Sequence, residues 1–251
     1  LPRHCGIATF TTHLADALAE ALPDADGLVL AMNDAGRRHD YPPRVRFEIR
    51  EGDLVSYRRA ADFLNVSRVD VLSVQHEYGI FGGKAGAHLL AFLRELRMPI
   101  VTTLHTILSQ PNPQQRAVLE ELARLSTRLV VMSASGAELL KRVHGIPDHQ
   151  IDLIPHGIPS VPADGRSKDR LGVEGKTVIL TFGLLSPDKG IEYVIDALPT
   201  ILAAHPDTIY IVLGATHPHV VEREGEAYRL MLEARGQRLG VGSSMIFHNR
   251  F

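Results

Sequence analysis

The stretch FGLLSPDKG, residues 182–190, joins two segments of different periodicity. Before it, the apolar run over residues 176–183 predicts a buried strand. After it, residues 190–205 have the apolar spacing of an amphipathic helix. Ligands of open α/β sheets bind outside the carboxyl ends of the strands, where the next helix begins. The sequence therefore predicts a binding site at this turn.

The residue types in the turn suit an anion, most naturally a phosphate. Lys189 brings a positive charge, and a helix that begins near it directs free N–H groups to the same place. Gly183 and Gly190 would let the backbone approach a ligand closely. The alternative is structural: Pro187 and Asp188 start the helix, and the lysine is solvated.

A second polar cluster lies in SVQHEYGIFGGKAG, residues 73–86. His76, Glu77 and Tyr78 directly follow a predicted strand, again at its carboxyl end. The loop glycines that keep the backbone accessible are Gly79, Gly82 and Gly83. Such a loop suits sugar hydroxyls, which can form bidentate hydrogen bonds with it. The alternative is a glycine-rich turn in which the histidine caps the strand.

Bulk composition describes a globular protein of 251 residues, with 45% hydrophobic and 22% charged residues. The formal net charge of −2 provides no broad field that would attract nucleic acid or an anionic membrane. Cys5 is the one cysteine, so an intrachain disulfide framework is excluded. The apolar runs are too short to span a bilayer. We expect a cytoplasmic protein with at most a peripheral membrane contact.

Apolar strands alternate with amphipathic helices along the chain, which predicts parallel sheets covered by helices. The expected strands are 26–33, 44–50, 69–76, 98–105, 126–133, 150–157, 176–183, 208–215 and 243–248. The expected helices are 6–22, 54–66, 84–97, 112–125, 133–144, 190–205 and 222–240.

Composition changes over residues 158–175, which are rich in proline, glycine and charge. We therefore predict a first domain over 1–160, a linker over 161–175 and a second domain over 176–251. The second domain has three expected strands and no helix after the last of them. We expect the chain to be a fragment of a longer protein.

FGLLSPDKGIEYVIDAL, residues 182–198, resembles the start of the C-terminal domain of family 4 glycosyltransferases with the GT-B fold. In that family a Gly-Arg pair is followed by Lys-Gly, and the arginine and lysine hold the donor diphosphate. Gly183, Lys189 and Gly190 match this pattern, whereas Leu184 stands where the arginine is expected. Either another cation or the backbone amides would then complete the phosphate site.

Further segments resemble the same family in the same order. PRHCGIATFTTHLADAL resembles its first glycine-rich loop, which implies that Gly6 approaches the donor phosphates or the acceptor. IVTTLHT resembles the strand that ends in a histidine near the transferred sugar, here His105. LVVMSASGAELL and IDLIPHGI resemble the last elements before the interdomain linker. MIFHNRF resembles the segment beside the nucleobase and ribose, which implies Phe247, His248, Asn249 and Arg250 as neighbours of that part of the donor.

The resemblance implies a fold of two Rossmann-like, doubly wound parallel-sheet domains, the second incomplete. It also implies a retaining transferase that moves a hexosyl group from a nucleotide diphosphate sugar to a sugar, glycan or lipid-linked hydroxyl acceptor. His105, Glu77 and His76 are the expected catalytic residues, and no metal or other cofactor is expected. The family's downstream pair of glutamates lies beyond residue 251, so this fragment alone is expected to be inactive.

Two other functions remain open on the sequence. A nucleotide-sugar epimerase on the same fold would need acid and base residues but no acceptor site. A non-catalytic module that binds sugar nucleotides or glycans would agree with Leu184 and with the missing glutamate pair. Analysis of reaction products separates the two enzymes, and two glutamates at the family's spacing in the downstream sequence would favour an enzyme over the binding module.

Overall fold

The computed structural model describes residues 1–3, 5–34, 36, 39–160 and 167–250. The chain divides into two compact units, Leu1–Pro159 and Ser160–Phe251. Residues 161–166 of the predicted linker lie outside the described residues. Each unit has its own hydrophobic core of buried aliphatic and aromatic side chains.

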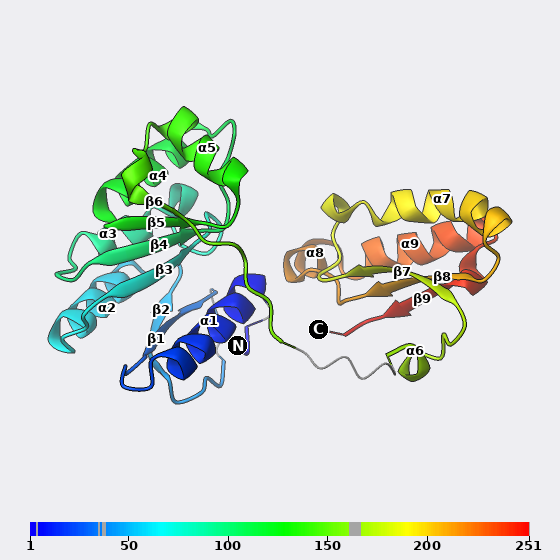
Figure 1. Ribbon diagram of the computed structural model, residues 1–251, viewed down its shortest axis with the longest axis horizontal. Helices are drawn as coiled ribbons and strands as arrows, with labels where there is room; N and C mark the ends of the chain where they lie inside the picture. The colour runs from blue at the N-terminus through cyan, green and yellow to red at the C-terminus, as the bar shows by residue number, and fades with distance from the viewer. Residues whose placement is uncertain (4, 35, 37–38, 161–166, 251) are drawn as a thin grey trace. The chain divides into compact units, whose positions relative to one another are not determined.

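Strands and helices alternate in both units (Figure 1). The strands are β1 (Val29–Asn33), β2 (Val45–Arg50), β3 (Leu72–His76), β4 (Ile100–Leu104), β5 (Arg128–Val131), β6 (Ile151–Leu153), β7 (Thr177–Phe182), β8 (Thr208–Leu213) and β9 (Met245–His248). The α-helices are α1 (Gly6–Ala21), α2 (Leu54–Val66), α3 (His88–Leu93), α4 (Pro113–Leu125), α5 (Ala134–His144), α6 (Ser167–Arg170), α7 (Ile191–Ala204), α8 (Pro218–Glu224) and α9 (Ala227–Arg238). The 3-10 helices are η1 (Lys84–Gly86), η2 (Asp148–Gln150), η3 (Pro187–Lys189) and η4 (Gly242–Ser244).

The strands of the first unit form two parallel sheets, one of β1 and β2 and one in the order β3-β4-β5-β6. The predicted parallel arrangement is confirmed. Because consecutive strands run in the same direction, their carboxyl ends lie along one edge of the sheet. The loops after β3 and β4 therefore emerge side by side.

Side-chain caps mark the starts of α4 and α5 in the first unit. The Asn112 side chain accepts a hydrogen bond from the Gln115 N–H at 2.9 Å, and the Gln115 side chain accepts one from the Asn112 N–H at 2.9 Å. This capping box starts α4. The Ser133 hydroxyl accepts a hydrogen bond from the Gly136 N–H at 3.1 Å and caps α5.

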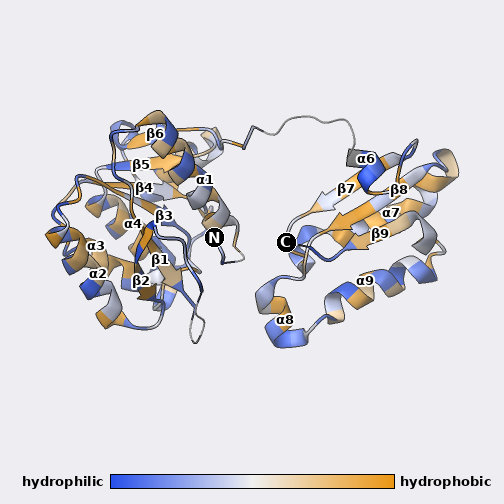
Figure 2. Ribbon diagram, turned by 90° about the horizontal axis from the view of Figure 1, so that it is seen from below, coloured by the Kyte–Doolittle hydropathy of each residue, from blue (hydrophilic) through white to orange (hydrophobic). Residues whose placement is uncertain are grey.

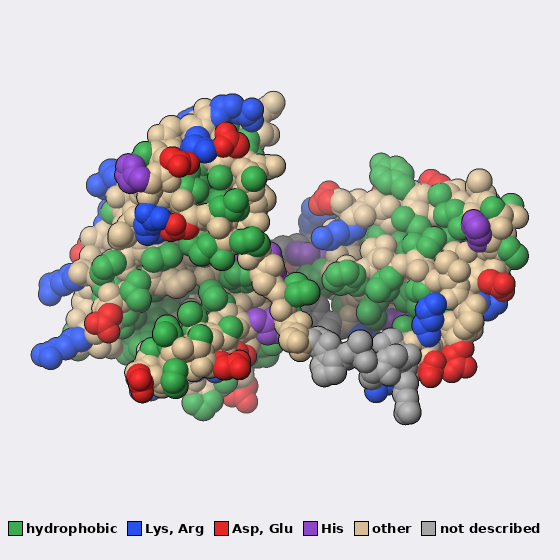
Figure 3. Space-filling view, viewed as in Figure 1, with side chains coloured by type: hydrophobic (Ala, Val, Ile, Leu, Met, Phe, Trp, Pro, Cys, Tyr) green, Lys and Arg blue, Asp and Glu red, His purple; other side chains and the backbone are tan. Residues whose placement is uncertain are grey.

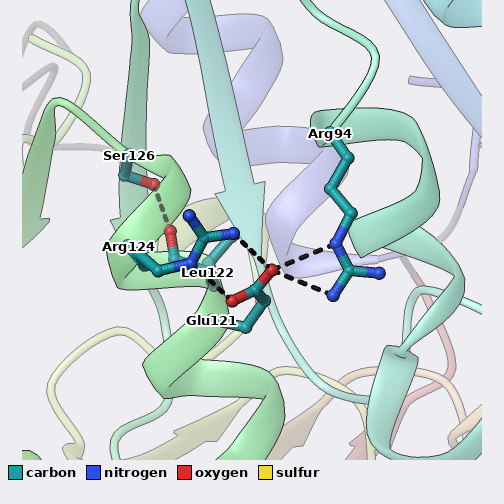
Figure 4. A network of polar contacts seen from close by, with 5 residues as sticks. All are labelled: Arg94, Glu121, Leu122, Arg124 and Ser126. Atoms are coloured by element: carbon teal, nitrogen blue, oxygen red, sulfur yellow. Dashed lines mark hydrogen bonds and ion pairs between the residues drawn. The ribbon is translucent and has the colours of Figure 1, made fainter.

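A charged cluster connects α4 to the end of α3 (Figure 4). The Arg124 guanidinium donates two hydrogen bonds of 2.8 Å to the Glu121 carboxylate, and Arg94 donates two more at 3.0 and 2.9 Å. These hydrogen bonds, those from Arg124 first, lower the pKa of Glu121 to about 2. The Ser126 hydroxyl donates to the Leu122 carbonyl at 2.8 Å and closes the helix end.

The second unit has one parallel sheet in the order β7-β8-β9. Helices α7 and α9 cover one of its faces, where Ile195 and Leu232 pack with Tyr210 of β8. Figure 2 shows the apolar residues concentrated in these strands. On the other face, Leu180 and Phe182 of β7 are 50% and 76% exposed. The segment predicted as one helix over 222–240 is instead divided between α8 and α9 at Gly225, whose φ is +60°.

Candidate functional site

The first site candidate lies where β3 and β4 end. The register pairs His76 with Leu104, and the backbone N–H of His105 donates to the His76 carbonyl at 3.0 Å. Glu77 and His105 therefore follow directly after neighbouring strand ends, as the sequence predicts for residues at one sheet edge.

The side chains at this edge are connected by hydrogen bonds. Nε2 of His105 lies 2.9 Å from the Gln75 amide oxygen. The Thr106 hydroxyl donates to one carboxylate oxygen of Glu77, and the Tyr78 N–H donates to the other at 2.9 Å. Burial lowers the pKa of His105, the neighbouring Glu77 charge opposes that shift, and a positive charge on His156 adds to it. The net effect favours the neutral imidazole at neutral pH.

His76 lies inside the core rather than at the surface of the site. Alternate strand residues face opposite sides of a sheet, so His76 faces away from Gln75. Its side chain is 0% exposed, stacks on Phe81 at 6.1 Å between ring centroids, and meets Tyr78 edge-on at 5.0 Å. Neither ring nitrogen has a hydrogen-bond partner in the described part of the chain, and burial lowers the pKa to about 4. The predicted catalytic role for this residue is incompatible with that position, because substrate cannot reach it.

The glycines of the adjacent loop have different surroundings. A Cβ at Gly82 would lie 2.0 Å from the Glu51 carbonyl oxygen, and one at Gly83 would lie 2.7 Å from the His88 ring. Packing therefore requires glycine at both positions, and Gly83 also has a φ of +81°. Gly79 has open space around its Cα, so it remains available to a ligand.

Tyr78 belongs to the same loop and is half-buried. Its hydroxyl is buried and has no hydrogen-bond partner among the described residues. Burial raises the pKa of Tyr78 to about 12. The predicted sugar-contacting role would require this hydroxyl to become accessible.

Gly6, the remaining glycine predicted in the first unit, is the first residue of α1. It is exposed, and a Cβ at this position would have no neighbour within 4 Å. The α1 N-terminus has no side-chain cap, so its first N–H groups remain available to a ligand. Packing within the described structure does not explain a glycine here.

The second site candidate lies at the carboxyl edge of the second unit's sheet. The Gly183 N–H donates to the Leu213 carbonyl at 3.0 Å, and the Gly214 N–H donates to the His248 carbonyl at 2.9 Å. Beyond the strands, the Leu185 N–H continues the pairing with the Ala215 carbonyl at 2.9 Å. This pairing holds the start of the Lys189 loop against the end of β8.

Lys189 ends the 3-10 turn η3 and is exposed, and it makes no salt bridge with any described residue. Gly190, with a φ of +64°, connects this turn to α7, whose N-terminus has no side-chain cap. Within the described residues, the N–H groups of Leu184, Gly190 and Ile191 donate to no carbonyl. The loop therefore offers one ammonium group and several backbone donors to an anion.

The four residues predicted beside the nucleobase and ribose differ in how exposed their side chains are. Phe247 is half-buried and packs against the core of the second unit. His248 is at the end of β9, and its buried Nε2 has no hydrogen-bond partner in the described chain. Asn249 and Arg250 follow and are exposed. His248 and the two exposed residues remain candidates.

Residues 5–160, more than half of the chain, match Glycosyltransferase Family 4. The chain belongs to glycosyltransferase family 4. No curated protein matches its sequence.

Solved structures that resemble this family 4 chain are GT-B glycosyltransferases. Anabaena Alr3699/HepE in complex with UDP and glucose has a TM-score of 0.70 at 18% identity, and the match covers 100% of this chain and 67% of that one. Sucrose-phosphate synthase from Thermosynechococcus elongatus has a TM-score of 0.71 at 17% identity, with coverages of 98% and 65%. WaaG, a glycosyltransferase involved in lipopolysaccharide biosynthesis, has a TM-score of 0.60 at 14% identity, with coverages of 98% and 67%. The fold is GT-B, and the chain spans about two thirds of the length of these structures.

The surface of the family 4 chain has no dominant charge on the face drawn in Figure 3, where acidic and basic side chains are interspersed. In the described ranges, no three His, Cys, Asp or Glu residues are grouped as metal ligands. None of the described helices has the length and apolar character needed to cross a membrane.

Four residues around His105 were not predicted from the sequence. Gln75 and Thr106 directly flank predicted site residues in QHE and LHT, so their proximity to the strand ends was a usable signal. Phe10 and His156 come from distant parts of the chain. Their rings meet at 5.0 Å between centroids, which no sequence pattern indicates.

Proposed function

We propose that this family 4 chain takes part in retaining transfer of a hexosyl group from a nucleotide diphosphate sugar to a hydroxyl acceptor. The observation that carries the proposal is the exposed Lys189, in a turn between Gly183 and the uncapped start of α7. A leaving diphosphate gains negative charge in the transition state, and a fixed cation and N–H groups stabilise such charge.

Backbone donors replace the arginine expected at Leu184. The free N–H groups of Leu184, Gly190 and Ile191 support this part of the proposal, because they are oriented by the pairing with β8 and by the start of α7. The ammonium group and the helix N-terminus take the role that a metal ion has in other transferases, so the proposed reaction needs no metal and no other cofactor.

In the proposed reaction, His105 and Glu77 position the transferred sugar. A neutral imidazole held by Gln75 and a carboxylate held by Thr106 can orient sugar hydroxyls and place the reacting oxygen. The carboxylate also favours the positive charge that develops at the anomeric carbon. The solved relatives support the donor class, since HepE was solved in complex with UDP and glucose.

A transfer assay tests the reaction class. Because residues 1–251 alone are expected to be inactive, the chain is first extended by a segment that supplies the family's downstream pair of glutamates. This extended protein is incubated with the glucose or mannose derivatives of UDP, GDP or ADP and with a panel of glucosides and mannosides. The products are analysed by proton NMR. The proposal predicts a product with the anomeric configuration of the donor. A product of inverted configuration would contradict the retaining mechanism, and an isomerised nucleotide sugar would identify an epimerase.

A further inference from the structure

Two imidazoles contact the same aromatic ring in the first unit. The Phe10 ring on α1 lies 4.9 Å from the His105 ring, at an interplanar angle of 87°, and 5.0 Å from the His156 ring, at 68°. His105 follows β4, and His156 follows β6. Both histidines thus lie beyond strand ends of one parallel sheet, and Phe10 contacts both rings.

Hydrogen bonds fix the tautomer of each imidazole. Nδ1 of His156 lies 2.6 Å from the Gly157 carbonyl oxygen, which can only accept, so Nδ1 carries the proton. Nε2 of His105 lies 2.9 Å from the Gln75 amide oxygen, so here Nε2 carries the proton. In the neutral forms, the lone pairs that remain are on Nε2 of His156 and Nδ1 of His105. No described residue donates a hydrogen bond to either nitrogen.

We propose that His156 binds a hydroxyl group of a hexose in the first unit, as a second imidazole acceptor beside His105. This inference rests on the proposed function for the class of ligand. Hydroxyl groups are donors that an imidazole lone pair accepts directly, and a sugar ring offers several of them at fixed spacing. His156 is exposed, so a sugar can reach it without any rearrangement of the core.

The electrostatics of the pair agree with this role. Burial lowers the pKa of His105. Glu77 acts in the opposite direction. The His105 ring therefore keeps its acceptor nitrogen at neutral pH. When the His156 ring is also neutral, the two histidines can accept from two hydroxyls together.

Variants at position 156 separate the acceptor nitrogen from the ring contact. In His156→Phe the aromatic contact with Phe10 is retained while both nitrogens are lost. In His156→Gln a side-chain oxygen acceptor is restored. His149→Phe is the matched control, since His149 is also exposed in the first unit but lies in η2, outside the site.

The test is an NMR titration of the full chain, labelled with ¹⁵N in histidine, with glucose, mannose and galactose as probes. We expect the free spectrum to show the Nδ1–H tautomer for His156 and the Nε2–H tautomer for His105. One of the hexoses should then shift the Nε2 resonance of His156. His156→Phe should bind that hexose roughly ten-fold more weakly, which is the value of about one hydrogen bond. His156→Gln should recover most of the loss, and His149→Phe should bind as the wild type does.

UDP, GDP and ADP are titrated in parallel, so that the two proposals can fail separately. Two results would overturn the role of His156 and leave the proposed function standing, provided that a nucleotide binds. In the first, hexose shifts the resonances of His105 but not those of His156. In the second, His156→Phe binds hexose with unchanged affinity. Absence of both nucleotide and hexose binding would overturn both.

Discussion

The carbonyl oxygen of Gly183 occupies the place where a side chain at Gly214 would begin. A Cβ on Gly214 would lie 1.8 Å from that oxygen, far inside van der Waals contact. Two glycines at the carboxyl ends of β7 and β8 thus allow the strands to continue side by side into the Lys189 loop. The candidate phosphate site depends on this contact for its shape.

Replacing Gly214 by alanine should therefore displace the loop and destabilise the second unit by about 1–3 kcal/mol, the usual cost of overpacking. Urea unfolding measures the change. Gly27→Ala is the control, because a Cβ there has no neighbour within 4 Å, and it should change stability by no more than about 0.5 kcal/mol. Equal stability of the two variants would show that the strand ends are not held as described.

Lys189→Ala should weaken binding of a nucleoside diphosphate roughly ten-fold and leave binding of the free nucleoside unchanged, because in the proposed site the ammonium contacts only the phosphates. Isothermal titration with UDP and uridine, or with the guanosine or adenosine pair, measures both. Lys176→Ala is the matched control: that lysine lies before β7, at the amino edge of the sheet, 3.0 Å from Asp207. An equal loss for diphosphate and nucleoside would exclude a phosphate role.

In the extended protein of the transfer assay, His105→Ala should reduce turnover roughly a hundred-fold, the scale of a lost positioning contact, and largely spare nucleotide affinity. Steady-state kinetics combined with nucleotide titration separates the two effects. His149→Ala, on the exposed η2 turn, should behave as the wild type does. Unchanged turnover in His105→Ala would remove this residue from the site.

The strand pattern of this chain could be predicted because each buried strand is a short apolar run bounded by turn residues. The strand predicted over KTVILTFG corresponds to β7, and the strand predicted over VDVLSVQH corresponds to β3. The positions of Glu77, His105 and Lys189 at the sheet edges could be predicted from strand direction alone.

The sequence does not show which face of the sheet a side chain at a strand end occupies, because a shift of one residue moves the side chain to the opposite face. His76 and Phe247 were placed in the site, and both face a core.

Local backbone conformation accounts for the other differences. Helix periodicity continues across Gly225, but its positive φ ends α8 and starts a new helix. The helix predicted over 84–97 begins instead with a 3-10 turn in which Ala85 has a φ of +53°, and α3 covers only His88–Leu93. Contacts between distant segments, such as Phe10 with His156, have no signature in a single sequence.

Buried His76 should make the first unit sensitive to acid. Its pKa is about 4 in the folded chain, below the ordinary value of 6.5, so the unfolded chain binds the proton more tightly. Stability is therefore fully present above pH 6.5 and is lost as the pH falls from 6.5 to about 4, by at most roughly 3 kcal/mol. Urea unfolding at pH 7.5, 6 and 5 measures this slope.

His76→Phe should flatten that slope, because the replacement cannot be protonated and retains the stacking on Phe81. His149→Phe serves as the control and should keep the wild-type slope. The same slope in all three proteins would assign the acid sensitivity to other groups.

We propose that this family 4 chain binds a nucleotide diphosphate sugar at the carboxyl edge of β7. The most direct measurement follows the melting temperature of the wild type and of Lys189→Ala with UDP-, GDP- and ADP-sugars. We predict that one nucleotide class raises the melting temperature of the wild type and that the rise is reduced in Lys189→Ala. A folded wild-type chain that none of these donors stabilises would contradict the claim.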